Sequence, residues 1–130
     1  MNRVFIKGGK IVNSKESFVA DILIEDEKIS KVFKNGEIAK LDEGTKVVDA
    51  SGKLIFPGFI DAHTHFELHV AGTVTCDDFY SGTRAAVSGG TTTIIDFGTQ
   101  YKGETLNEGM DNWLKKAKDG VFCDYGIHMS

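Results

Sequence analysis

The chain has 130 residues, of which 41% are hydrophobic and 26% charged, as is typical of a soluble globular domain. Its formal net charge of −4, with no basic cluster among aromatic residues, argues against a nucleic-acid partner. No apolar run approaches the roughly 20 residues that span a bilayer, and the N-terminus lacks a signal-peptide layout. Cys76 and Cys123 match neither a zinc spacing nor a CxxC motif, so we expect reduced thiols in a cytoplasmic protein.

The first fifty residues predict short β-strands that form a small unit with a structural role. Gly8 and Gly9 join two β-rich runs and are typical of a two-residue hairpin. The apolar runs at residues 22–24 and 29–33 flank an acidic turn and predict a second hairpin. Further turns are expected at residues 42–45 and 51–53.

From Leu54 onward the pattern changes to alternating strands and helices. The run "LIFPGFIDAHTHF" is apolar on both faces, as are strands of a covered parallel sheet. A helix is expected next, with Thr75 as its N-cap, Asp78 at the third position and Gly89-Gly90 at its end. Its predicted apolar face consists of Phe79, Thr83, Ala86 and Val87.

A second strand and a second helix follow. Residues 91–97, "TTTIIDF", are short and β-branched, and Thr105 with Glu108 forms a full capping box before a helix that Gly120 ends. The expected apolar stripe of this helix consists of Leu106, Met110, Trp113, Leu114 and Ala117. With a third strand in "CDYGIHMS", the order predicts parallel βαβ units.

Two histidines at the end of the first of these strands are the candidate site. Residues two apart on a strand point to the same face, so His63 and His65 project together beside the carboxylate of Asp61. Two neutral imidazoles can share one divalent metal ion at about 2.0–2.1 Å per nitrogen. The alternative is a pair of strand histidines satisfied by backbone carbonyls. The two histidines end an apolar strand, after Pro-Gly-x-Ile-Asp and before a loop. This position favours a metal site over the alternative.

The stretch from Pro57 to Gln100 resembles a known family. It contains PG-x-ID-x-HTH, then GTVT-x-DDF, then GGTTTIIDF. These motifs are similar to the N-terminal part of the dihydropyrimidinase and D-hydantoinase group of the metal-dependent amidohydrolase superfamily. The first motif indicates the superfamily, and the other two indicate the hydantoinase-like branch.

This resemblance implies an α/β fold, the N-terminal part of a (β/α)₈ barrel with about three βα units, preceded by strands of a small β-sandwich. Residues 1–54 would supply the sandwich strands and residues 55–130 the incomplete barrel. His63 and His65 would bind the more buried zinc of a two-zinc centre. A hydroxide that bridges the metals would open a small cyclic amide, a hydantoin or dihydropyrimidine, to an N-carbamoyl amino acid. The resemblance also implies a homo-oligomer, a tetramer in the complete protein.

The resemblance also implies parts that are absent from this sequence. These are a carbamylated lysine that bridges the metals, two later histidines and a late catalytic aspartate. Three lysines, Lys115, Lys116 and Lys118, lie on the second predicted helix and are poor candidates for the bridge. Three parallel strands leave an open edge. We therefore expect a truncated chain that is inactive as it stands.

Residues near the histidines bear on the substrate. In dihydroorotases the position similar to Glu67 is an arginine that binds the substrate carboxylate. An acid there would repel such a substrate, which argues against dihydroorotase activity. The Glu-Pro-Gly run of allantoinases is also missing, although an allantoinase-like hydrolase is kept as an alternative. Val70 would form a wall of the substrate pocket, or else only pack in a loop. His69 replaces the more usual proline and is expected to be an exposed loop histidine.

Other acids and imidazoles have competing interpretations. Asp96 could support the metal ligands or make a purely structural hydrogen bond, and His128 is expected to be a core histidine. Asp77 and Asp78 are expected at a helix N-terminus, where their negative charge interacts favourably with the helix dipole, and no chemistry is assigned to them. Two other classes stay open: a non-catalytic assembly protein on the same scaffold, and a free-standing α/β binding domain. Retention of both histidines argues for the enzyme.

Overall fold

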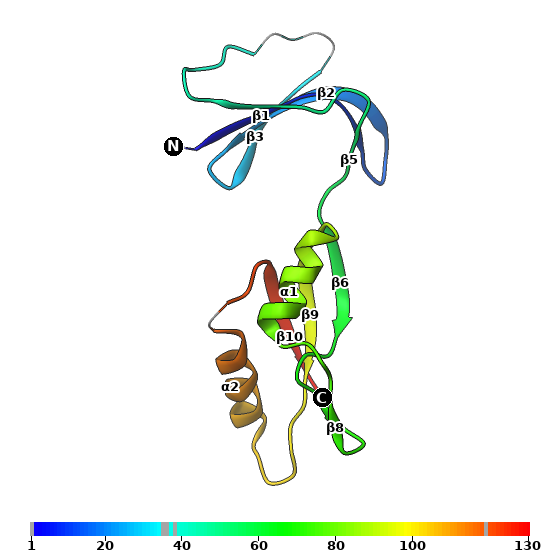
Figure 1. The fold of residues 1–130 in the computed structure, drawn as a ribbon, viewed down its shortest axis with the longest axis vertical. Coiled ribbons are helices and arrows are strands. Elements are labelled where there is room, and N and C mark those ends of the chain that lie inside the picture. The colour runs from blue at the N-terminus through cyan, green and yellow to red at the C-terminus, as the bar shows by residue number, and fades with distance from the viewer. Residues whose placement is uncertain (1, 35–36, 38, 119) are drawn as a thin grey trace. The chain divides into compact units, whose positions relative to one another are not determined.

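The β-rich first part of the chain and the strand–helix part after it fold as separate units. The computed structural model describes residues 2–34, 37, 39–118 and 120–130 (Figure 1). The first unit is Met1–Pro57 and the second is Gly58–Ser130. Each unit has its own sheet.

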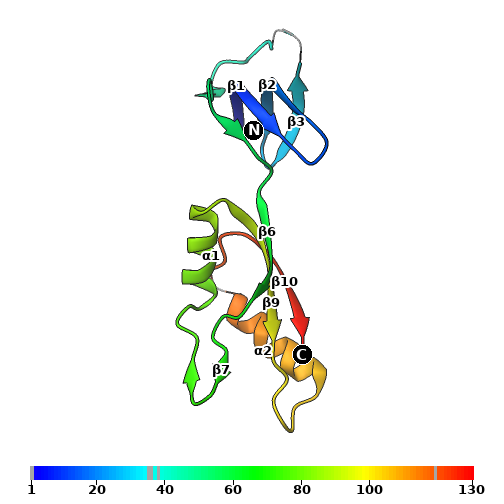
Figure 2. The same cartoon turned by 90° about the vertical axis from the view of Figure 1, so that its right-hand side faces the viewer.

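The first unit contains a five-stranded sheet (Figure 2). Its order is β3-β2-β1-β4, and β5 also pairs with β1. The pairs β1–β2 and β2–β3 are antiparallel, whereas β4 and β5 both run parallel to β1. The strands are β1 (Arg3–Val12), β2 (Ser17–Glu25), β3 (Lys28–Phe33), β4 (Lys46–Asp49) and β5 (Leu54–Ile55).

The hairpin predicted at Gly8-Gly9 is wrong, because β1 runs straight through these residues. The pairing register with β2 shifts between Ile6 and Gly9, which is a β-bulge. Gly8 has a φ of 72° and its N–H donates to Asp21 Oδ1 at 2.7 Å. The positive φ that glycine permits is therefore used here in a bulge and not in a hairpin turn. The hairpin predicted farther along is confirmed: β2 and β3 are joined at Asp26 and Glu27.

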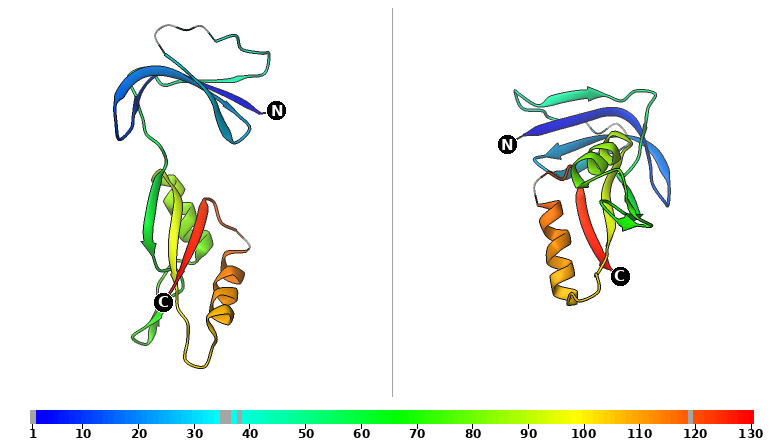
Figure 3. Two further views of the ribbon diagram at one scale, coloured as in Figure 1. Left: turned by 180° about the vertical axis from the view of Figure 1, so that it is seen from behind. Right: turned by 60° about the horizontal axis from the view of Figure 1, so that its bottom comes forward.

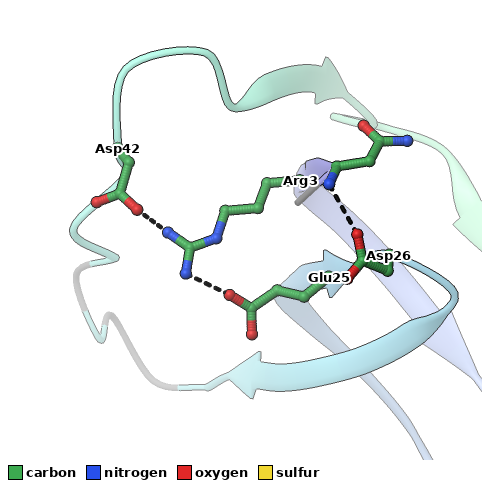
Figure 4. Close-up of polar contacts among 5 residues, drawn as sticks. Arg3, Glu25, Asp26 and Asp42 are labelled. Carbon is green, nitrogen blue, oxygen red and sulfur yellow. Dashed lines mark hydrogen bonds and ion pairs between the residues drawn. The ribbon is translucent and has the colours of Figure 1, made fainter.

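An ion-pair network closes one end of this sheet (Figure 4). The Arg3 guanidinium binds Glu25, with Nη2 to Oε1 at 2.5 Å, and its Nη1 pairs with Asp42. The network ties β1 to the end of β2 and to the segment before β4. Its charges are partly exposed, so it orients the chain more than it stabilises it.

The second unit is a parallel sheet with helical connections. Its order is β10-β9-β6, and both pairs are parallel (Figure 1). The elements are β6 (Phe59–Thr64), β7 (His69–Val70), β8 (Thr73–Val74), α1 (Phe79–Ser88), β9 (Thr91–Gly98), α2 (Leu106–Ala117) and β10 (Asp124–Met129). The predicted parallel strand–helix–strand order is confirmed. In the described residues, neither helix is long and apolar enough to cross a bilayer.

The two helices pack together on one face of this sheet (Figure 3). Phe79 of α1 and Trp113 of α2 share a core with Ile94 of β9. Along β9 the burial alternates, and Ile94, Asp96 and Gly98 are buried toward the helices. Phe97 therefore points to the opposite face, because side chains on a strand alternate. Of the stripe predicted for α2, Trp113 and Ala117 are buried, whereas Leu106 and Leu114 are exposed.

The apolar run that begins at Leu54 forms two strands instead of one. Leu54–Ile55 is β5 and pairs with β1, whereas Phe59–Thr64 is β6 and pairs with β9. Within the described part of the chain, β6 is an edge strand, and Ile60 is 66% exposed. The apolar pattern predicts that both faces of β6 are covered, and the described residues do not cover both. The open sheet edge that the sequence predicts is present in the described part of the chain.

Asp78, and not Thr75, is the N-cap of α1. The Asp78 carboxylate accepts from the Ser81 N–H at 2.7 Å, and the Ser81 hydroxyl accepts from the Asp78 N–H at 3.1 Å. Thr75 instead closes the β7–β8 hairpin, since its hydroxyl accepts from the Leu68 N–H at 2.9 Å. The capping box predicted for α2, with Thr105 and Glu108, is confirmed, and that helix has its C-cap at Lys118.

The cap of α1 gives a pH-dependent contribution to stability. The Ser81 backbone N–H, followed by its side chain, lowers the pKa of Asp78 below its usual 3.8. A carboxyl whose pKa is lowered by folding stabilises the fold above its unfolded pKa, and this contribution is lost as the pH falls through the folded pKa. We expect the full-length polypeptide to unfold at a higher temperature than its Asp78→Asn variant at neutral pH. This difference should shrink below pH 3.8. A difference that stays constant down to pH 2 would contradict the assignment.

Two buried helix glycines should differ in their response to alanine. A Cβ at Gly82 would lie 2.2 Å from the Phe66 ring, which is itself packed against Phe79. At Gly109 the nearest atom is the Met129 methyl at 2.9 Å, the mobile end of a flexible side chain. We expect Gly82→Ala to destabilise the full-length polypeptide by about 1–3 kcal/mol in denaturant unfolding. Gly109→Ala should stay within about 1 kcal/mol of the wild type, and equal losses would refute the comparison.

Candidate metal centre

The two histidines converge at the carboxyl end of β6. Their Nε2 atoms lie 3.0 Å apart, and the two rings meet edge to face with centroids 4.9 Å apart. His63 is on β6 and His65 follows its last residue, so the two-residue spacing places both on the same side of the chain. Both side chains are exposed. The predicted convergence of the two imidazoles is therefore present.

The geometry of the pair fits a shared metal ion. Zinc lies about 2.0–2.1 Å from each imidazole nitrogen, so two nitrogens 3.0 Å apart can both reach one ion. The same separation also suits an N–H···N hydrogen bond if one ring donates, and the tautomers decide which. No group of three or more potential ligands gathers among the described residues. A complete zinc site therefore needs ligands from beyond them.

An aromatic ring lies against the pair from the neighbouring strand. Phe97 on β9 stacks on His63, with centroids 4.3 Å apart and planes at 28°, and its centroid is 5.5 Å from that of His65. His128 on β10 lies on its other side at 5.3 Å. The prediction of a core position for His128 is wrong, because that residue is exposed. Sequence reasoning missed Phe97, although strand alternation puts it on the face of β9 away from the helices.

Two aspartates hold the backbone near the pair. Asp61 Oδ1 accepts from the His63 N–H at 3.2 Å, so its carboxylate holds the backbone of His63. Asp96 is completely buried on the helix side of the sheet. Its carboxylate accepts from the Thr64 hydroxyl at 2.8 Å and from the Phe66 N–H at 3.0 Å. Both aspartates therefore contact the backbone or side chains next to the histidines.

The loop after the pair holds the predicted pocket residues. Glu67 has a φ of 47°, and its N–H donates to the Asp77 carbonyl at 3.0 Å. His69 and Val70 form β7, which pairs with β8, and both are exposed. The roles of Glu67 and Val70 in a substrate pocket stay predictions.

The lysines of α2 lie on the helix side of the sheet. Lys116 Nζ sits 4.1 Å from the centroid of the Trp113 ring and donates to the Glu67 carbonyl at 3.3 Å. Since the imidazoles and Phe97 lie on the opposite face, the contacts of Lys116 agree with its exclusion as a metal bridge.

The histidine pair lies at a strand end of a parallel strand–helix–strand sheet, and the comparison with known families identifies this scaffold. The amidohydrolase family model matches residues 54–130, and the chain belongs to this family. It is 49% identical over 127 residues to a dihydropyrimidinase of Dictyostelium discoideum, covering 98% of this chain and 25% of that protein. A D-hydantoinase of Streptomyces coelicolor is 43% identical over 129 residues, which are 98% of this chain and 28% of that protein.

A solved structure gives the same result for the fold. A crystal structure of D-hydantoinase superposes with a TM-score of 0.88 at 46% identity, covering 98% of this chain and 27% of that one. These matches confirm the predicted resemblance and the predicted fold class: the N-terminal part of a (β/α)₈ barrel, preceded by strands of a small β-sandwich. The chain spans about a quarter of the length of the relatives it matches.

Proposed function

We propose that this chain is part of a zinc-dependent hydrolase that opens the ring amide of hydantoins or dihydropyrimidines. The observation that carries the proposal is the 3.0 Å approach of the His63 and His65 Nε2 atoms at a strand end, in a chain of the amidohydrolase family. Carboxyl ends of barrel strands are where such folds place their chemistry. The names of the similar proteins, dihydropyrimidinase and D-hydantoinase, support this substrate class.

In this proposal the residues of the chain hold and orient the metal. His63 and His65 bind through Nε2 as neutral imidazoles, and Phe97 packs against the His63 ring and limits its rotation. Zinc, when bound, supplies a Lewis acid that polarises the amide carbonyl and activates water. Two zinc ions per complete site are part of the proposal. Glu67 and Val70 belong to the loop that would face the substrate ring.

The activity is assigned to the full-length polypeptide encoded by the gene. Two ligands leave a zinc site incomplete, so we expect the 130 residues alone to be inactive. Residues of the first unit would contribute to the β-sandwich and those of the second to the barrel. We further propose a cytoplasmic homo-oligomer, a location consistent with the free thiols of Cys76 and Cys123. The retained histidine pair favours this enzyme over a non-catalytic assembly protein on the same scaffold.

Replacing the two histidines tests the proposal. We expect His63→Ala combined with His65→Ala, in the full-length polypeptide, to lower the zinc content by about tenfold or more and to abolish ring hydrolysis. Zinc is measured by elemental mass spectrometry, and hydrolysis with hydantoin and dihydrouracil. His69→Ala removes an exposed imidazole from the adjacent hairpin, and it should leave the zinc content unchanged. Full zinc content and activity in the double variant would overturn the proposal.

A further inference from the structure

Asp96 is a buried carboxylate with three hydrogen-bond donors around it. It lies near the end of β9, completely shielded from solvent. Oδ1 accepts from the Thr64 hydroxyl at 2.8 Å and from the Phe66 N–H at 3.0 Å, and Oδ2 accepts from Trp113 Nε1 at 2.8 Å. The Phe66 N–H and the Trp113 indole N–H can only donate, so each carboxylate oxygen accepts at least one hydrogen bond.

Two of these donors flank a single residue, His65. Thr64 immediately precedes it and Phe66 immediately follows it, and a single carboxylate oxygen binds both. Side chains alternate along an extended chain, so Thr64 and Phe66 turn to the helix side while His65 turns to the other. The β6–β9 pairing is also irregular here, with a register shift between Asp61 and Thr64. The Asp96 carboxylate thus fixes the chain where the regular ladder ends.

Helix α2 fixes the carboxylate in turn. The Trp113 ring is 1% exposed and donates to Asp96 from the core that it shares with Phe66 and Phe79. The same helix holds the chain at a second point, because Lys116 donates to the Glu67 carbonyl, two residues beyond His65. Two side chains of α2, one turn apart, therefore reach the segment that carries the ligand.

The burial of Asp96 makes this arrangement rigid. A buried polar group that loses its hydrogen-bond partners destabilises the fold, so a movement of Thr64, Phe66 or Trp113 away from Asp96 is unfavourable. Any displacement of the backbone at residues 64–66 would leave the carboxylate underpaired. The backbone on both sides of His65 is held in place by that constraint.

We propose that Asp96 is a positioning residue: by binding both neighbours of His65, it sets the approach of His65 Nε2 to His63 Nε2. This inference rests on the proposed metal centre, since the position of the imidazole matters only if it binds a metal. Asp96 itself lies on the opposite face of the sheet and acts through the backbone. Partners that orient a ligand in this way typically change metal affinity or activity by about 10–100-fold.

The test is the zinc affinity of the full-length polypeptide carrying Asp96→Asn. An amide presents one acceptor and one donor atom, so it cannot accept from all three donors. We expect zinc to bind about 10–100-fold more weakly in competition with a chelator. The Co²⁺-substituted variant should also show shifted visible absorption bands. Ile94→Val is the matched control, because Ile94 is buried two residues earlier on the same face and makes no such polar contact to residues 64–66.

Thermal unfolding of each variant separates positioning from general destabilisation. Asp96→Asn with weakened zinc binding, beside Ile94→Val with wild-type affinity, supports the proposal. Equal affinities in the two variants would overturn it and leave Asp96 a structural residue. If Asp96→Asn does not fold, Thr64→Val carries the test, since it removes one donor and keeps the side-chain shape. We then expect weaker zinc binding, and unchanged binding would overturn the proposal.

A His65→Ala arm distinguishes this inference from the proposed function. Loss of zinc in His65→Ala with normal affinity in Asp96→Asn refutes the positioning role alone. Normal zinc content in His65→Ala refutes the metal centre and, with it, the positioning role.

Discussion

The hydrogen bonds of the Asp96 carboxylate connect the main parts of the second unit. They bind the end of β6 through Thr64 and Phe66, and they bind α2 through Trp113. The two faces of the sheet therefore have different structural roles. One face packs the helices against Ile94, and the other presents His63, His65 and Phe97. The two imidazoles are exposed, but residues that fix the backbone beside them are buried. This division lets a buried core hold two exposed imidazoles in place.

Local patterns predicted much of this structure. The two-residue spacing of His63 and His65 determines that they share a face, because side chains on a strand alternate. The capping box of Thr105 and Glu108 was equally clear, since its partners are three residues apart. Failures arose where one residue type serves two purposes. Gly8 supplied a positive φ within a bulge, and a hairpin turn requires the same property.

Contacts between distant residues could not be derived from the sequence. Asp96 meets Phe66, Thr64 and Trp113 across separations of 30, 32 and 17 residues. Its sequence position allowed both a structural and a supporting role, and only the fold shows that two of its partners surround His65. Phe97 was missed for the same reason: its stacking on His63 depends on the register between two strands.

The proposed function depends on the binding of a metal ion by His63 and His65. Anomalous diffraction at the zinc absorption edge, from crystals of the full-length polypeptide grown with zinc, tests it most directly. We predict an anomalous peak about 2.0–2.1 Å from the Nε2 atoms of both histidines. Zinc bound only elsewhere, with the two imidazoles joined by an N–H···N hydrogen bond, would contradict the claim.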